Sequence, residues 1–179
     1  ETDFVARDSN FIDLAKSIAN KLLENDESEV INEISDEISS IISKLGENIK
    51  LRRFTKVNKN NYIYGYTHNN KIASIVELKK ENDSLAKDIC MQIVASNPLA
   101  LNEASIDSST ILSEKEIYKK ELENIDKKDD IKRNILEGKM KKFINDNTLL
   151  NQPFVKDPST SLSKIIKDNE IISFTRYEV

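Results

Sequence analysis

Residues 62–78 read YIYGYTHNNKIASIVEL, two strand-like runs joined by a pair of asparagines. The tyrosines of the first run occupy every second position and so share one face of a strand, and the second run is rich in β-branched residues. Asparagine tolerates a positive φ better than most residues, so Asn69 and Asn70 are typical of a tight turn. The stretch therefore predicts an antiparallel hairpin, with His68, Asn69, Asn70 and Lys71 at its exposed tip.

The segments that follow the hairpin predict a helix that packs on it and a further strand. Residues 83–95 carry apolar side chains at helical spacing, Cys90 among them, and predict a helix that covers one face of the hairpin. Residues 96–110 are small and polar and predict a surface linker. A short helix over 161–167 and a strand over 171–179 end the chain, and we expect this last strand to pair with the hairpin.

The residues before the hairpin change pattern at residue 48. Stretches 8–25 and 28–45 each carry an apolar stripe with the period of a helix, and only a few polar residues separate them, so they predict an antiparallel helical pair. Asp8 or Ser9 can cap the first helix, and Gly46 is placed to end the second. Residues 48–57 then alternate with period 2, which predicts a half-exposed strand.

A highly charged segment, residues 113–146, has only a narrow apolar seam. Ser113 and Glu116 match a capping box at its start, and the run Lys127–Asp130 interrupts the seam halfway. This pattern predicts an antiparallel helical hairpin that projects from the rest of the chain.

Together these segments predict an α+β fold: two small subdomains with antiparallel sheets covered by helices, and an inserted antiparallel helical hairpin. The predicted boundaries are 1–59 for the N-terminal subdomain, 60–108 with 147–179 for the C-terminal subdomain, and 109–146 for the coiled-coil hairpin.

Composition excludes several classes of function. The net charge of −4, with basic and acidic residues intermingled, gives no signature of a nucleic-acid partner. No apolar run reaches the length of a membrane span, and the start does not resemble a secretory signal. The three glycines fall in no phosphate-binding loop pattern, and the single cysteine excludes an intrachain disulfide and a CxxC metal site.

Candidates for catalysis are few. His68 has no neighbouring partner in the sequence for acid–base chemistry, and Cys90 lies on the buried stripe of its helix, which favours a structural role. We therefore expect a protein that is not an enzyme, with no catalytic residue, no metal site and no cofactor.

The first residues, ETDFVA, hold the most distinctive candidate for partner binding. Asp3 and Phe4 stand side by side just ahead of the first amphipathic helix. In isolation such an acid is most often a helix cap and such an aromatic a core residue. The rest of the chain decides between these interpretations and a functional one.

In chain order, several motifs make the sequence resemble the elongation factor Ts family. The motifs are TDFVA at 2–6, GENI at 46–49 with Arg52 and Arg53, Tyr66 and His68 at the hairpin tip, EKE at 114–116, EGKMKKF at 137–143, QPFV at 152–155 and RYEV at 176–179. They extend over nearly the whole chain. The resemblance implies a core of two α+β subdomains with a coiled-coil hairpin inserted in the second.

The resemblance also implies a function and a partner. It implies a guanine-nucleotide exchange factor that promotes GDP release from elongation factor Tu during translation elongation and stabilises the nucleotide-free form. Residues Thr2, Asp3, Phe4 and Val5 would enter the partner's G domain and help to dislodge Mg²⁺. His68, Asn69 and Asn70 would make a second contact, although the family often carries Gly-Ala-Arg where this chain has Asn69, Asn70 and Lys71.

Other expectations concern the extent of the chain and its setting. The sequence begins at Glu1 without a methionine, and we expect a fragment that lacks the family's small N-terminal helical domain and the strand before Thr2. We expect a bacterial cytoplasmic protein, with an organellar matrix as the alternative. The sequence leaves open whether two copies associate. A non-catalytic structural or interaction module built on the helical hairpin is the competing functional class, whereas a small hydrolase would need a second ionisable group near His68.

Overall fold

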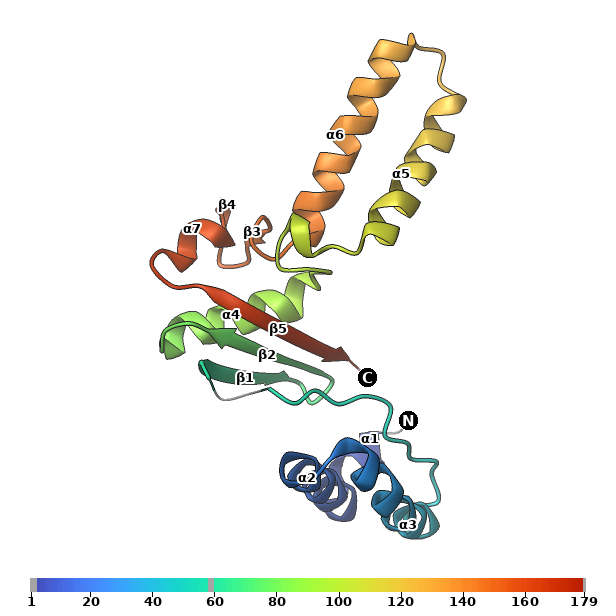
Figure 1. The fold of residues 1–179 in the computed structure, drawn as a ribbon, viewed down its shortest axis with the longest axis vertical. Coiled ribbons are helices and arrows are strands. Elements are labelled where there is room, and N and C mark those ends of the chain that lie inside the picture. Colours follow the sequence, from blue (N-terminus) through green and yellow to red (C-terminus); the bar gives the residue numbers. More distant parts are fainter. Residues whose placement is uncertain (1–2, 58–59, 179) are drawn as a thin grey trace. The chain divides into compact units, whose positions relative to one another are not determined.

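A computed structural model describes residues 3–57 and 60–178, drawn in Figure 1. The chain divides into two compact units, Glu1–Asn58 and Lys59–Val179. The first contains α1 (Asp3–Arg7), α2 (Ser9–Glu24) and α3 (Glu27–Leu45). The second contains β1 (Tyr62–His68), β2 (Ile72–Leu78), α4 (Asp83–Ser96), a 3₁₀ turn (Glu103–Ser105), α5 (Ser108–Glu123), α6 (Asp129–Asn147), β3 (Pro153–Phe154), β4 (Asp157–Ser161), α7 (Leu162–Ile166) and β5 (Ile171–Glu178). The predicted α+β class is confirmed.

The first unit is built on the predicted helical pair. Helices α2 and α3 pack together through a small buried cluster, because each places apolar side chains on one stripe. The members of that cluster are Leu14, Ile18, Leu22, Val30 and Ile34. Gly46 ends α3 with a φ of 74°, and its N–H donates to the Ile42 carbonyl at 2.8 Å. A residue with a Cβ would be strained in this left-handed conformation, so glycine suits the position.

The strand predicted for residues 48–57 is wrong, because the described residues there form an irregular extended segment. Ile49 and Leu51 of the alternating set pack against the helical pair, and so does Phe54, which lies outside that alternation. Lys56 Nζ also donates to the Leu23 carbonyl at 3.1 Å, at the end of α2. None of the described residues of the first unit is a strand, so this segment has no sheet to join there. The alternation matched burial at Ile49 and Leu51, but further along Phe54 is half-buried and Thr55 is exposed, and the described backbone there does not pair as a strand.

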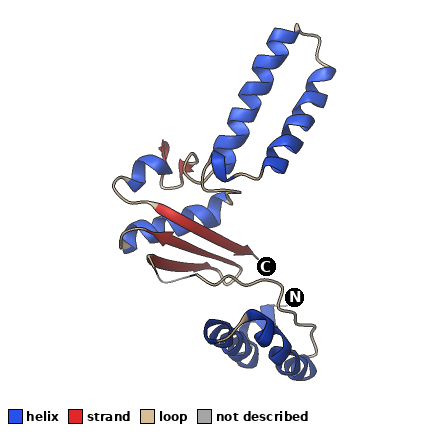
Figure 2. Cartoon of the chain, viewed as in Figure 1, coloured by secondary structure: helices blue, strands red, loops and turns tan. Residues whose placement is uncertain are grey.

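The second unit is organised around the hairpin of β1 and β2. The three-stranded sheet has the order β1-β2-β5 and is antiparallel throughout, as Figure 2 shows. Its register places Tyr66 opposite Ser74 and Ser74 opposite Arg176. Both the predicted hairpin and the predicted pairing of the last strand with it are confirmed.

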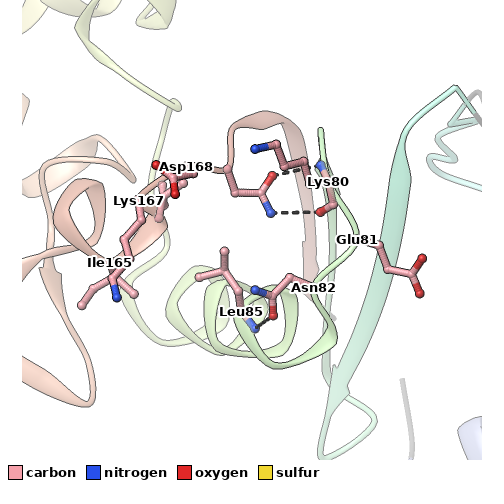
Figure 3. Close-up of a pocket in the computed structure, with 9 residues that line it drawn as sticks. Lys80, Glu81, Asn82, Leu85, Ile165, Lys167 and Asp168 are labelled. Carbon is pink, nitrogen blue, oxygen red and sulfur yellow. Dashed lines mark hydrogen bonds between the residues drawn. The ribbon is translucent and has the colours of Figure 1, made fainter.

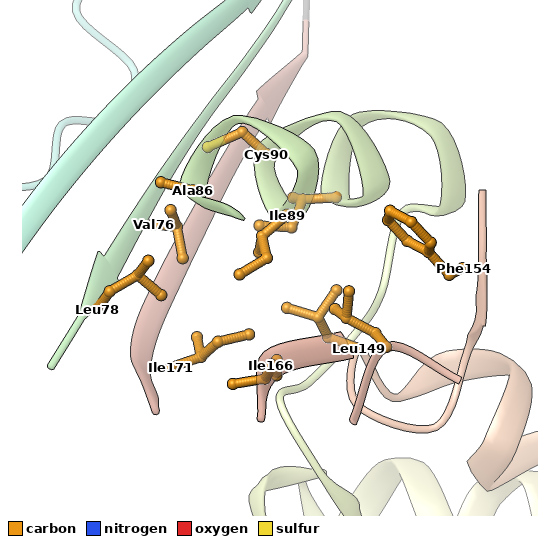
Figure 4. Packing of buried hydrophobic residues seen from close by; sticks show 11 residues of the cluster. Val76, Leu78, Ala86, Ile89, Cys90, Leu149, Phe154, Ile166 and Ile171 are labelled. Carbon is orange, nitrogen blue, oxygen red and sulfur yellow. The ribbon is translucent and has the colours of Figure 1, made fainter. Parts of the chain in front are cut away.

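Helix α4 covers one face of this sheet and contributes most to the larger core. Figure 4 shows apolar side chains from β2, α4 and the returning chain meeting in one cluster. Its fully or nearly buried members are Val76, Leu78, Ala86, Ile89, Cys90, Ile93, Leu149, Phe154, Leu162, Ile166 and Ile171. The three tyrosines of β1 are half-buried against it, as expected for a strand with one covered face.

Helices α5 and α6 form the predicted antiparallel hairpin, which we call the arm. Its two legs are joined by buried Leu122, by a contact between Lys139 Nζ and the Tyr118 ring at 4.9 Å, and by an ion pair between Lys139 and Glu121. The capping box predicted at Ser113 is wrong. Helix α5 already begins at Ser108, because the Asp107 side chain accepts from the Ser109 N–H at 3.1 Å.

The segments between α4 and the arm are better packed than the predicted surface linker. Ala100 and Ile106 are buried, and Ala100 forms a parallel bridge with Thr148. The two-stranded sheet of β3 and β4 was not predicted, since strands this short give no detectable alternation. Within the described ranges, 3–57 and 60–178, no helix is both long and apolar enough to cross a membrane.

Candidate partner-binding sites

Helix α1 presents Phe4 to solvent. The Phe4 side chain is 88% exposed, more than any other large hydrophobic side chain among the described residues. Exposure of a whole aromatic ring gains nothing for folding, so such a ring is available for binding. Of the other residues predicted for this site, Thr2 and the side chain of Asp3 lie outside the described part, and Val5 is half-buried.

Asp8 holds the short α1 in a fixed relation to α2. Its N–H donates to the Val5 carbonyl at 3.0 Å, and its carboxylate accepts from the Asn10 N–H at 2.8 Å and from the Asn10 side-chain amide at 3.0 Å. These hydrogen bonds to Asn10 lower the pKa of Asp8, so the cap is ionised at neutral pH. Asp8 is thus the N-cap of α2, and Phe4 lies one turn before it on a separate helix.

The helical pair beneath this site is held by charge as well as by its core. Lys21 on α2 forms an ion pair with Glu37 on α3, and Glu37 also accepts from Ser17 Oγ at 3.3 Å. The hydrogen bond between Lys21 and Glu37 raises the pKa of Lys21 and lowers that of Glu37. A shallow groove of about 500 Å³ between the helices is lined by acids and small polar groups, with Asp13, Asp36 and Glu37 among them.

The tip of the β1-β2 hairpin is the second predicted site. Asn69 and Asn70 have φ values of 51° and 56°, and the Lys71 N–H closes the turn on the His68 carbonyl at 3.0 Å. Two successive positive φ values are what the asparagine pair was expected to supply. The predicted turn at Asn69 and Asn70 is confirmed, and His68, Asn69 and Asn70 are all exposed there.

Both ring nitrogens of His68 already have neighbours within the tip. Nδ1 lies 3.2 Å from the Tyr66 hydroxyl, and Nε2 lies 3.2 Å from the side-chain nitrogen of Asn69. When the Asn69 amide donates to Nε2, Nδ1 carries the proton and donates to the tyrosine oxygen. This arrangement orients the imidazole and contains no carboxylate, so it resembles a rigid contact surface more than an acid–base pair.

A groove of about 360 Å³ in the second unit lies between the start of α4 and the loop that precedes β5, as shown in Figure 3. Asn82 caps α4 by accepting from the Leu85 N–H at 3.1 Å. Asn169 makes two bonds to Lys80, accepting from its N–H at 3.0 Å and donating to its carbonyl at 2.9 Å. The charged residues that line the groove are of both signs: Lys80 and Lys167 are basic, and Glu81 and Asp168 are acidic. The Asn169 amide joins two chain segments, the Asn82 amide caps α4, and the residues that line the groove form no catalytic constellation.

The remaining reactive groups do not gather into a site. Across the residues that the structure describes, no group of three histidines, cysteines or acids is placed to hold a metal ion. Cys90 is fully buried in the larger core, and burial raises the pKa of its thiol. The prediction that Cys90 is a core residue is confirmed, since a buried protonated thiol is a poor nucleophile.

Sequence reasoning did not single out one buried polar cluster. Gln92 and Gln152, both almost inaccessible to solvent, hydrogen-bond to each other and to the backbone where the arm joins the sheet and α4. Gln152 was noticed only as part of the motif QPFV, and Gln92 sits among apolar residues of α4. Gln92 could have been predicted from the sequence, because it is a polar residue on the buried stripe of an amphipathic helix, where polar residues are rare.

The fold and these surfaces define a class of protein: an α+β protein with a projecting helical arm, an exposed aromatic on a short helix and an exposed hairpin tip closed by two asparagines. The model of the family described as "Elongation factor TS" matches residues 1–179, and the chain belongs to this family.

Curated relatives named elongation factor Ts align along this whole chain. The relative from Halothermothrix orenii is 40% identical over 198 residues, covering 100% of this chain and 66% of the relative. The relative from Legionella pneumophila (strain Paris) is 36% identical over 191 residues, covering 100% of this chain and 65% of the relative. That from Clostridium acetobutylicum is 38% identical over 204 residues, covering 99% and 67%. The chain thus spans about 65% of the length of the relative from Legionella pneumophila.

Proposed function

We propose that this chain promotes the release of GDP from elongation factor Tu during translation elongation, as a guanine-nucleotide exchange factor that makes and breaks no covalent bond. Membership of the elongation factor Ts family supports the partner and the activity. The observation that carries the proposal is the exposure of Phe4, 88%, at the position where the family resemblance predicts contact with the partner's G domain.

The mechanism follows from differential binding. Bound GDP and Mg²⁺ hold a GTPase in its closed arrangement, so a factor that binds the nucleotide-free form more tightly accelerates nucleotide loss. The coupling is reciprocal, and nucleotide rebinding therefore expels the factor. In this proposal Phe4 is an apolar wedge that displaces a switch-region helix of elongation factor Tu. Asp3 makes polar contacts that fit only the displaced arrangement, and the Mg²⁺ site is lost as a result.

Thr2 and Val5 complete this contact in the proposal, and His68, Asn69 and Asn70 make a second one with another domain of the partner. The second contact is supported by the rigidity of the tip, because its turn and the His68 ring are already ordered by internal hydrogen bonds. A preorganised tip loses little conformational entropy when it binds.

A second candidate function is a non-catalytic interaction module that binds through the arm. The observation in its favour is a set of exposed aliphatic side chains on the arm: Leu112 at 63%, Ile117 at 48% and Ile131 at 44%. This candidate gives Phe4 no role.

Release of a fluorescent GDP analogue from elongation factor Tu separates the two candidates. The chain is mixed with the loaded partner and excess unlabelled GDP, with EDTA as the reference for complete Mg²⁺ removal. Faster release that depends on Asp3 and Phe4 supports the exchange proposal. Binding without faster release, lost when residues 113–146 are removed, would favour the interaction module instead.

A further inference from the structure

The arm is mounted on the second unit mainly through α6. The carbonyls at the end of α6 lack partners within the helix, as at any helix C-terminus, and here other groups satisfy them. Asn147 O accepts from the Leu99 N–H at 2.9 Å, and Thr148 Oγ1 donates to the Ile144 carbonyl at 2.7 Å. Beyond the helix, the Leu149 N–H donates to the Ala100 carbonyl at 2.9 Å.

Besides these backbone bonds, the Gln152 side chain connects this helix end to the last residue of α4. The amide nitrogen of Gln152 donates to the Asp146 carbonyl at 2.8 Å and to the Ser96 carbonyl at 3.2 Å. Asp146 lies in the last turn of α6, and Ser96 is the last residue of α4. Because helix C-termini carry partial negative charge, a donor shared between two of them relieves a repulsion as well as satisfying both carbonyls. Gln152 is 3% exposed, so water does not take over this role.

Gln92 fixes the orientation of the Gln152 amide. Its side-chain nitrogen lies within hydrogen-bond distance of three acceptors, Ser96 Oγ at 3.0 Å, the Pro153 carbonyl at 3.1 Å and Gln152 Oε1 at 3.3 Å, and its Oε1 accepts from the Val155 N–H at 2.7 Å. The acceptor side of Gln152 is thus occupied, which leaves its two amide hydrogens for the two helix ends. Every polar atom of the two side chains has a partner, and a buried network of this kind specifies one arrangement.

We propose that Gln152, held by Gln92, is a positioning residue that sets the direction of the arm relative to α4 and the sheet. Backbone hydrogen bonds of Leu99 and Leu149 tie the end of α6 to the segment that follows α4, and the apolar contacts around them have no directional preference. Gln152 adds two directional bonds from one planar amide: the bond to Asp146 is lost if the end of α6 turns, and the bond to Ser96 is lost if the end of α4 turns. The arm is therefore a rigid lever, and its direction is a property of the isolated chain rather than of a complex.

The test measures arm direction directly. Cysteines are introduced at two exposed positions, Thr67→Cys on β1 and Asp130→Cys near the far end of the arm, and labelled with nitroxides. Cys90 does not compete for label, because it is buried and its thiol pKa is raised. Pulsed electron paramagnetic resonance then gives the distribution of distances between the labels, and no partner protein is required.

The informative variant is Gln152→Glu. A carboxylate has nearly the same shape but cannot donate, and its charge faces two helix C-termini. We expect a single narrow distribution for the parent chain and, in the variant, a displaced distribution of at least about twice the width, because the two side-chain bonds to the helix ends are gone. The matched control is Asn145→Asp, the same amide-to-acid change at an exposed position on α6, and it leaves the distribution unchanged.

Each outcome decides the matter. Helical circular dichroism first establishes that Gln152→Glu is folded, and Gln152→Met, which removes the donors without adding charge, takes its place if it is not. A folded variant with the parent distribution overturns the proposal. If neither variant folds, the network is needed for folding alone, and the proposal that Gln152 sets the direction of the arm is rejected. The measurement is independent of the proposed exchange activity, so a chain without that activity still tests the role of Gln152.

Discussion

Phe4→Ala is the change that most directly tests the proposed exchange mechanism. The side chain is 88% exposed, so its removal should alter the free energy of unfolding by no more than about 0.5 kcal/mol. Burial of the same ring against a partner contributes about 2–3 kcal/mol, since a phenylalanine side chain transfers apolar surface at about 25 cal/mol per Å². At 1.4 kcal/mol per factor of ten, the variant should bind elongation factor Tu about 30- to 140-fold more weakly.

The assay is stopped-flow release of fluorescent GDP at subsaturating concentrations of the chain, with urea unfolding of each variant measured in parallel. Leu23→Ala is the matched control, because Leu23 is a large apolar side chain of the same unit that is 62% exposed. The reasoning is refuted if Phe4→Ala releases GDP as fast as the parent chain, or if Leu23→Ala loses as much activity as Phe4→Ala.

Three further predictions concern stability and titration. Ile89→Ala should cost about 2–5 kcal/mol in urea unfolding, because Ile89 is fully buried, whereas Ile172→Ala, at 40% exposure, should cost far less. Asn70→Val should destabilise the chain by about 1–2 kcal/mol, since a β-branched residue is strained at a φ of 56°; equal midpoints of unfolding would contradict this. The Glu114 carboxylate beside Tyr118 raises the pKa of this phenol from 10.0 to about 12. Stability from this shift is complete below pH 10 and is lost as pH rises towards 12. The Asp83 carboxylate raises the pKa of Tyr62 to about 12 as well, so alkaline titration at 295 nm should show two late-ionising tyrosines, of which Tyr118→Phe removes one.

Elements with strong local patterns were predicted from the sequence. The β1-β2 hairpin, the helical pair α2-α3 and helix α4 all appear within a residue or two of their predicted bounds. In each case a long periodic stripe coincides with local chemistry that favours the same boundary, such as Gly46 after α3. A local motif can mislead: Ser113 matches a capping box, but the Asp107 cap begins the helix six residues earlier.

The sequence predicted the geometry of one candidate site but not that of the other. The turn at Asn69 and Asn70 was predictable because backbone strain there depends on the two residues alone. The exposure of Phe4 was not, since an aromatic before an amphipathic helix is equally consistent with burial; only the packing of α1 leaves the ring in solvent. The role proposed for Thr2, Asp3, Phe4 and Val5 remains a prediction.

The sequence by itself determined the local elements, the turn chemistry and the family, because these depend on neighbouring residues and on motif order. Only the tertiary structure determined the conformation of residues 48–57. Their alternation suits a strand, but they pack against two helices and have no strand to pair with in the described part of the first unit. The tertiary structure alone also brought Gln92 and Gln152, 60 residues apart, into one network at the base of the arm. The pairing of buried amides with helix ends is set by how elements meet in space, and no local pattern in the chain encodes it.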